Sequence, residues 1–156
     1  MKRILFICMG NICRSPAAEG IMQKKVANQG LEAFFYIDSA GTYGWHEGEL
    51  PDSRMRKHAL RRGYNLTSHS RPITHNDFEQ FDLIIGMDDD NIQNLQRRAP
   101  NLHSKQKICR MTDFCRIHHA DCVPDPYYGG ASGFELVLDL LEDACDGLID
   151  QLKLEM

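Results

Sequence analysis

The chain has 156 residues and a formal net charge of −4, so we expect one domain that spans residues 1–156. Its 42% hydrophobic and 26% charged content is typical of a soluble globular protein and excludes disordered, collagen-like and low-complexity classes. No apolar run approaches the ~20 residues of a membrane helix, and the apolar run after Arg3 is too short for a signal peptide. The negative charge gives no electrostatic reason to bind nucleic acid, so we expect neither a nucleic-acid nor a membrane partner.

Six cysteines are too few for a disulfide scaffold in a chain of this length. Because the sequence shows no secretion signal, the expected location is the reducing cytoplasm, where thiols stay free. None of the cysteines forms the paired CxxC spacing that indicates a zinc site. The segment 118–122, which contains two histidines, an aspartate and a cysteine, matches no metal-site spacing, and we interpret it as a solvated loop.

Apolar runs alternate with helical patterns along the chain, which predicts an α/β fold with a parallel sheet. Strands are expected over residues 2–8, 35–39, 83–87 and 107–111. Helices are expected from Ser15–Pro16 to Gln29, from Pro51–Asp52 to near Gly63, over residues 74–80 and 89–98, and along the apolar stripe from Phe134 to Leu152. The predicted fold is a single domain with a doubly wound, four-stranded parallel sheet flanked by helices. Such sheets bind ligands at the carboxyl ends of their strands.

Several residues mark the ends of these elements. Ser15 suits an N-cap, Pro16 suits the first helical position, and Gly30 suits a helix stop. The run Asp88–Asp90 is interpreted as charge that stabilises a helix start, and a structural role near the site stays open for Asp88. Residues 112–132 form a long irregular segment, and long loops inside compact domains are often functional.

The most informative stretch is residues 8–15 (CMGNICRS), which connect the first strand to the first helix. A turn that leads into a helix N-terminus points backbone N–H groups inward and, with the helix dipole, makes an anion site. Gly10 permits a close approach of the backbone, and Asn11 tolerates a left-handed conformation. Arg14 can add a bidentate fork to two oxygens of a tetrahedral oxyanion.

Cys8 lies in the same electric field, which favours its thiolate, the reactive form of the side chain. Ser15 can donate a hydrogen bond to that sulfur. A thiolate beneath a cradle for a dianion is the arrangement that attack on phosphorus requires. The alternative interpretation is a core cysteine at the end of a strand beside a surface arginine.

Phosphoryl transfer from an ester also requires a proton donor for the leaving oxygen. The best candidate is Asp125, which opens the sequence DPYYGG in the long irregular segment. Pro126 restricts Asp125 to an extended conformation, and two adjacent tyrosines can wall a pocket for a planar ring. Taken alone, DPYYGG is also typical of a turn with aromatic residues, so its interpretation depends on its pairing with Cys8.

The sequence resembles the low-molecular-weight protein tyrosine phosphatases over essentially its whole length. The resemblance rests on four motifs in the family's order, which are CMGNICRSPAAEG, SAGTYGWHEGELPD, DFEQFDLIIGMDDDN and DPYYGG. It implies that Cys8 attacks phosphorus to form a phosphocysteine while Asp125 protonates the tyrosine oxygen and then activates water. It further implies that Arg14 and the loop amides hold the phosphate oxygens, and that neither a metal nor a cofactor is required.

The resemblance also assigns supporting residues. The phosphate-binding loop comprises Met9, Gly10, Asn11, Ile12, Cys13 and Arg14. A polar support network comprises Asn11, Ser15, Ser39 and His69, and the substrate entrance comprises Met9, Trp45, Tyr127 and Tyr128. Cys13 matches a thiol that forms a reversible disulfide with the nucleophile, which would protect Cys8 from irreversible oxidation.

The sequence departs from the family at two places. The family has a His-x-Ala-Arg run where this chain reads Ser68-His69-Ser70-Arg71, one residue shorter. Tyr43 and His46 flank Trp45 in a loop that varies within the family, so the resemblance does not transfer substrate preference.

Four other functions share parts of this pattern. An arsenate reductase on this fold needs two further redox cysteines after the third strand, and residues 86–102 contain none. A protein arginine phosphatase typically carries threonine at the position of Ile12. A phosphotyrosine-binding module needs neither Cys8 nor Asp125, and a phosphocysteine carrier of a sugar transport system does not need Asp125. We therefore expect an enzyme that acts on phosphotyrosine-containing proteins as a monomer or weak dimer.

Overall fold

The protein contains one parallel sheet of four strands, in the order β2-β1-β3-β4. The computed structural model describes residues 1–127 and 129–156, and Tyr128 lies outside the described residues. The strands are β1 (Lys2–Cys8), β2 (Phe35–Gly41), β3 (Leu83–Gly86) and β4 (Ile108–Arg110). All three strand pairs are parallel, and Cys8 at the end of β1 lies beside Gly41 at the end of β2. The predicted fold class is confirmed.

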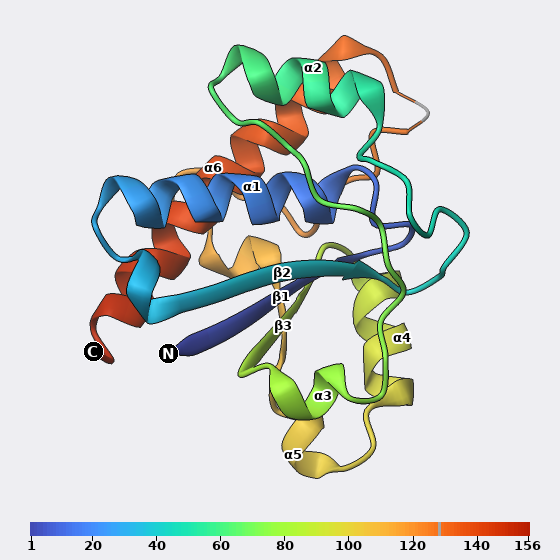
Figure 1. The fold of residues 1–156 in the computed structure, drawn as a ribbon, viewed down its shortest axis with the longest axis vertical. Helices are drawn as coiled ribbons and strands as arrows, with labels where there is room; N and C mark the ends of the chain where they lie inside the picture. Colours follow the sequence, from blue (N-terminus) through green and yellow to red (C-terminus); the bar gives the residue numbers. More distant parts are fainter. Residues whose placement is uncertain (128) are drawn as a thin grey trace.

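Helices cover both faces of the sheet (Figure 1). One face carries α1 (Arg14–Asn28), α2 (Ser53–Arg61) and α6 (Ala131–Lys153). The other face carries α3 (Asp77–Gln80), α4 (Asp89–Arg98) and α5 (Leu102–Lys105). The chain leaves β1 toward β2 on one side and later returns to β3 on the other, so the strand order reverses beside β1. In doubly wound sheets this switch point is where ligands bind.

The alternation of side chains along β1 explains its continuous apolar sequence. Ile4, Phe6 and Cys8 pack into the core beneath α1 and α6, whereas Leu5 and Ile7 pack into the smaller core on the opposite face. Successive strand residues point to opposite faces, so a strand that is buried on both sides must be apolar throughout. This alternation also directs the Cys8 side chain toward the N-terminus of α1.

The last helix follows the predicted apolar stripe. α6 has 23 residues, and its buried positions include Phe134, Leu141 and Leu148. Of the helices among residues 1–127 and 129–156, none combines the length and the hydropathy that a membrane span requires.

Helix ends and short elements account for the differences from the predicted pattern. α1 begins at Arg14, so the predicted N-cap at Ser15 is wrong, whereas Gly30 has the positive φ of a helix stop. Three short elements fall where no element was predicted, and these are η1 (Glu32–Phe34), α5 and η2 (Met111–Phe114). A single turn is too short to show hydrophobic periodicity, so sequence patterns do not report it.

Candidate active site

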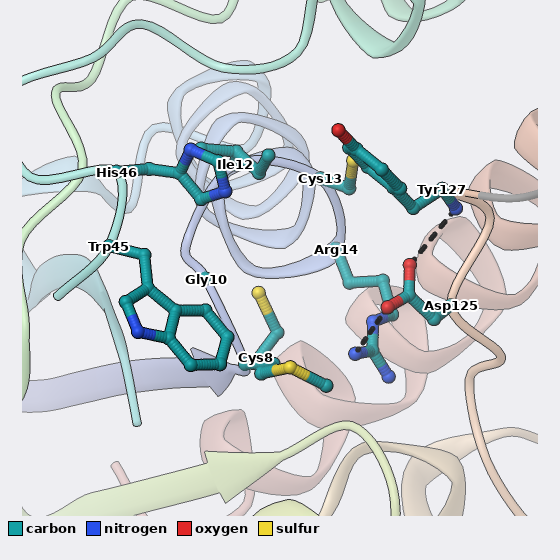
Figure 2. Close-up of a pocket in the computed structure, with 10 residues that line it drawn as sticks. Cys8, Gly10, Ile12, Cys13, Arg14, Trp45, His46, Asp125 and Tyr127 are labelled. Atoms are coloured by element: carbon teal, nitrogen blue, oxygen red, sulfur yellow. Dashed lines mark hydrogen bonds and ion pairs between the residues drawn. The ribbon is translucent and has the colours of Figure 1, made fainter. Parts of the chain in front are cut away.

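A pocket of about 230 Å³ opens at the carboxyl end of β1, where the sheet reverses its strand order. It is lined by Cys8, Met9, Gly10, Ile12, Cys13, Arg14, Trp45, His46, Asp125 and Tyr127. Figure 2 shows Trp45 and Tyr127 on opposite sides of Cys8. The fold thus brings together residues from three segments, 8–14, 45–46 and 125–127, that are far apart in the sequence.

The loop between β1 and α1 is held by its carbonyl groups. The carbonyls of Cys8 and Met9 accept hydrogen bonds from the backbone of residues 42 and 43, at 2.9 and 3.0 Å. The Gly10 carbonyl accepts from the Ser70 hydroxyl at 2.9 Å. The Ile12 carbonyl accepts from the backbone N–H of residue 52 at 2.7 Å. Each of these carbonyls is drawn toward the surrounding protein.

The amides of the same loop are free to bind a ligand. Among the described residues, no protein acceptor takes a hydrogen bond from the backbone N–H groups of residues 9–14. Asn11 has φ 57°, the left-handed conformation that turns successive amides toward one concave side. Together with the N-terminus of α1, this concave row of N–H groups is a site for an anion.

The Cys8 sulfur lies at the base of this loop. It is 2.9 Å from the Ser15 hydroxyl and accepts a longer contact, 3.5 Å, from the Ser15 backbone N–H. The sulfur therefore faces the Ser15 hydroxyl, the start of α1 and the Arg14 guanidinium. A sulfur in this position can act as a nucleophile on a group that the loop amides bind.

The Arg14 guanidinium is buried, with 2% exposure, and is fixed by oxygens on two sides. Its Nη1 donates to Asp88 Oδ2 at 2.6 Å and to the carbonyl of Val123 at 3.0 Å. Burial by itself lowers the pKa of Arg14, but the neighbouring charges of Cys8 and Asp88 reverse this effect and raise it. The guanidinium therefore stays a cation and keeps a fixed orientation beside the pocket.

Asp125 reaches the pocket from the segment before α6. Its Oδ2 lies 3.7 Å from Arg14 Nη2, and its Oδ1 accepts a hydrogen bond from the Tyr127 backbone N–H at 3.0 Å (Figure 2). The side chain is 37% exposed. A carboxyl group at the mouth of the pocket can exchange protons with solvent and with a group bound above Cys8, which a general acid and base must do.

Three of the four residues predicted for the support network lie together. Asn11 Nδ2 donates to the Ser15 hydroxyl at 2.8 Å and to the Ser39 hydroxyl at 2.9 Å. Asn11 Oδ1 accepts from the Arg71 backbone N–H at 3.0 Å. The three side chains are buried, so the network joins the loop rigidly to β2 and to the segment around residue 71.

The assignment of His69 to this network is wrong. His69 is exposed and, among the described residues, has no hydrogen-bond partner. Ser70 and Arg71 contact the loop instead, through the Ser70 hydroxyl and the Arg71 backbone N–H. Backbone hydrogen bonds from Gly41 to Arg71 and from Ser70 to Glu49 fix the register of this segment, and that register turns His69 outward.

The predicted entrance residues border the pocket. Trp45 is 71% exposed and stacks on Tyr43, with ring centroids 4.6 Å apart. Met9 and Tyr127 also line the pocket, and Tyr128 lies outside the described residues. Cys13 is buried beside the same cavity as a free thiol. Burial raises the pKa of this thiol, and the charges of Asp52 and Cys8 raise it further.

Comparisons with known proteins agree with this geometry. Residues 3–156 match the family model described as low molecular weight phosphotyrosine protein phosphatase. The chain belongs to this family. A low molecular weight protein-tyrosine-phosphatase of Streptomyces coelicolor is 39% identical, with 97% of this chain and 93% of the relative covered.

Solved structures of phosphatases are similar to this chain over nearly its whole length. The crystal structure of a protein tyrosine phosphatase from Entamoeba histolytica has a TM-score of 0.95 and 51% identity, covering 98% of this chain and 97% of the other. An arginine phosphatase from Drosophila has a TM-score of 0.90 and 30% identity, covering 98% of both chains. Membership places the chain among the protein-tyrosine-phosphatase hydrolases, whose family mechanism passes through a phosphocysteine.

Two acidic residues of this phosphatase also contact the site residues: Asp88, for which the sequence left a structural role near the site open, and Glu19, which the sequence analysis did not single out. Asp88 caps α4 through a capping box with Asn91, as its position at the helix start indicated, and the same carboxylate holds Arg14. Glu19 is buried on α1 and accepts a 2.5 Å hydrogen bond from the Ser39 hydroxyl. In the sequence, only the spacing of four residues between Ser15 and Glu19, which puts both on one helix face, could have linked Glu19 to the site.

We predict that Asp88→Asn lowers kcat/KM for p-nitrophenyl phosphate about 10–100-fold, because small displacements of a substrate-holding group cost rates of this order. Asparagine caps a helix as well as aspartate does, so α4 should stay intact and the loss should come from Arg14. Asp89→Asn is the matched control, since Asp89 is exposed and pairs with Arg110 instead. Equal activities of the two variants would contradict the prediction.

We predict that Glu19 makes stability depend on pH. Burial and the charge of Asp38 raise its pKa from 4.5 to about 7, against the opposing hydrogen bond from Ser39. Between pH 4.5 and about pH 7, Glu19 is protonated in the folded chain and ionised in the unfolded chain. The free energy of unfolding is therefore highest below this range and falls as pH rises through it. The shift corresponds to about 3 kcal/mol.

Urea unfolding measured from about pH 4.5 to about pH 8 tests this linkage. The free energy of unfolding of Glu19→Gln should rise relative to the wild type across the interval, by about 1–3 kcal/mol. Glu32→Gln, which removes an exposed carboxylate from η1, should keep the wild-type slope. Parallel curves for the wild type and Glu19→Gln would rule out the assigned shift.

Proposed function

We propose that this phosphatase hydrolyses phosphotyrosine in proteins, and aryl phosphate monoesters generally, with Cys8 as nucleophile, Arg14 as oxyanion ligand and Asp125 as general acid and base. The observation that carries the proposal is the placement of all three groups around one pocket whose backbone N–H groups have no acceptor among the described residues. The amides of Met9 to Arg14 would hold the three non-bridging oxygens of the phosphoryl group.

In the first step, the Cys8 thiolate attacks phosphorus and the bond from phosphorus to the tyrosine oxygen breaks. Asp125 gives its proton to that oxygen, so tyrosine leaves as the neutral phenol and Asp125 becomes a carboxylate. The Arg14 guanidinium and the loop amides stabilise charge on the equatorial oxygens during the transfer. The Ser15 hydroxyl, 2.9 Å from the sulfur, stabilises the thiolate before attack.

In the second step, water attacks the phosphocysteine. The Asp125 carboxylate takes a proton from this water, and the phosphorus–sulfur bond breaks. The products are free phosphate and the Cys8 thiolate. Asp125 is then protonated again and ready for another cycle. The 3.7 Å separation of Asp125 Oδ2 from Arg14 Nη2 supports this role, because the base would then lie beside the oxygens that the guanidinium holds.

The walls of the pocket favour an aryl ester. The side chains of Trp45 and Tyr127 stand on opposite sides of the nucleophile and can contact a planar ring between them. Ile12 adds an apolar group to the lining. Protein arginine phosphatases typically carry threonine at this position. These features support phosphotyrosine over phosphoarginine, although the Drosophila arginine phosphatase shares the fold.

Two features separate this proposal from the other functions. Burial raises the pKa of the Cys109 and Cys115 thiols, to about 12 and about 11, which disfavours the redox chemistry that arsenate reduction requires. Asp125 at the pocket mouth has a task in hydrolysis but none in a binding module or a phosphocysteine carrier. We also propose a cytoplasmic location, which the six free cysteines support.

We predict that Cys8→Ser abolishes detectable turnover of p-nitrophenyl phosphate, because the hydroxyl is a far weaker nucleophile than the thiolate. Asp125→Asn should lose roughly 10²–10⁴-fold in rate, the usual contribution of general acid catalysis. Cys122→Ser and Asp121→Asn, which alter the same residue types outside the pocket, serve as matched controls. Turnover that survives Cys8→Ser would refute the mechanism.

We further propose that Cys13 protects the nucleophile from oxidation. Peroxide oxidises the Cys8 thiolate to a sulfenic acid and releases hydroxide. The Cys13 thiol then attacks that sulfur, forming a Cys8–Cys13 disulfide and releasing water. Burial keeps Cys13 protonated, which supports Cys8 rather than Cys13 as the residue that peroxide oxidises first.

We predict that peroxide treatment yields a Cys8–Cys13 linkage by mass mapping and an inactivation that thiol reductants reverse. In Cys13→Ser, Cys8 should pass to the sulfinic acid, and reductant should not restore activity. Cys109→Ser should behave like the wild type. Reversible inactivation of Cys13→Ser would count against the protective role.

A further inference from the structure

A buried carboxyl group lies directly behind the phosphate-binding loop. Glu19 is 9% exposed and projects from α1 toward β2. Its Oε1 accepts the Ser39 hydroxyl at 2.5 Å, and its Oε2 accepts the Gln23 amide at 3.4 Å. Among the described residues, no cation lies within 4.0 Å of this carboxylate, although the charges of Asp38 and Arg71 reach it. Glu19 therefore has no ion-pair partner that would explain its burial.

The hydrogen bonds around Glu19 have a fixed direction. The Arg71 backbone N–H can only donate, so Asn11 must present Oδ1 to it and Nδ2 to the two serines. Ser39 then accepts from Asn11, and its own hydroxyl proton needs another acceptor. Glu19 supplies this acceptor. A Ser39 hydroxyl without it would be a buried and unsatisfied donor, which is costly.

The same amide directs the second serine. Ser15 accepts from Asn11 Nδ2 at 2.8 Å, which leaves its hydroxyl proton to be donated to the Cys8 sulfur at 2.9 Å. Asn11 is the junction of both branches and holds an unfavourable left-handed φ of 57°. Its orientation therefore depends on the partners of both serines, and a change at either serine reaches the nucleophile.

We propose that Glu19 is a positioning residue for the nucleophile: as the terminal acceptor of the chain Asn11–Ser39–Glu19, it fixes the Asn11 amide that makes Ser15 donate to Cys8. This inference rests on the proposed role of Cys8. The required property is a hydrogen-bond acceptor rather than a negative charge, because both the carboxyl and an amide carbonyl can accept the Ser39 proton.

Two substitutions separate the acceptor from the shape of the side chain. Glu19→Gln keeps the length and a carbonyl acceptor, whereas Glu19→Met keeps similar length but removes the acceptor. The primary measurement is the rate at which iodoacetamide alkylates Cys8 at about pH 6, followed at this residue by mass mapping. The second measurement is kcat/KM for p-nitrophenyl phosphate.

We expect Glu19→Met to lower both quantities about tenfold, since the lost donation to the sulfur is worth about one hydrogen bond. Glu19→Gln should stay within about threefold of the wild type. Asp143→Asn is the control, because Asp143 is another buried carboxylate on a helix but accepts backbone N–H groups of residues 116–118, away from the pocket. Its alkylation rate should equal that of the wild type.

A double-mutant cycle with Ser39→Ala tests the path. Ser39→Ala should reproduce the loss seen in Glu19→Met, and Glu19→Met should add nothing in the Ser39→Ala background, because the chain is already broken. If Glu19→Met does not fold, Ser39→Ala and Glu19→Gln still decide the question.

A folded Glu19→Met or Ser39→Ala that alkylates at the wild-type rate would overturn the inference. A Glu19→Gln variant as slow as Glu19→Met would also overturn it, because that result assigns the effect to charge. These outcomes differ from failure of the proposed function, which would appear as turnover that survives Cys8→Ser.

Discussion

The site depends on how the carbonyl groups of one short loop are bonded. Between β1 and α1, the carbonyls of residues 8, 9, 10 and 12 each accept a hydrogen bond, and the donors lie in three other segments, at residues 42 and 43, 52 and 70. A peptide group whose carbonyl is held on one side presents its N–H on the other. With Asn11 in the left-handed conformation, the amides of the loop converge on one point. A loop held in this way is preorganised for an anion, because binding would not have to order its backbone.

The arginine of the site is oriented by a carboxylate that also caps a helix. The Asp88 carboxylate closes the capping box of α4 through one oxygen and holds Arg14 through the other. One residue thus fixes a helix on one face of the sheet and a guanidinium at the ligand site. Because β1 and β3 are neighbours at the switch point, the segments that follow them meet there without any long connection. The topology explains why residues 74 positions apart in sequence form an ion pair.

The buried polar network behind the loop connects the nucleophile to structure that substrate never touches. Asn11, Ser15 and Ser39 are nearly inaccessible to solvent, so each hydrogen bond they lose would leave an unsatisfied group. Such networks restrict a site to a single arrangement when every member is satisfied. Glu19 terminates this network despite the cost of burying a carboxyl group, which its raised pKa reflects. The cost falls on stability, whereas the gain is a fixed direction of hydrogen bonding at the sulfur.

The sequence by itself determined the strands, the long helices and the strand–loop–helix arrangement around residues 8–15, because local periodicity and the strand-to-helix transition are properties of neighbouring residues. It also pointed to Asp125, although only as the partner of Cys8. The tertiary structure decided which side chains complete the site. His69 faces solvent because backbone pairing with β2 sets the register of its segment, and Ser70 takes the contact with the loop. Glu19 and Asp88 acquire their roles only when distant segments pack together, since a carboxylate on a helix has no distinguishing pattern until its partners are known.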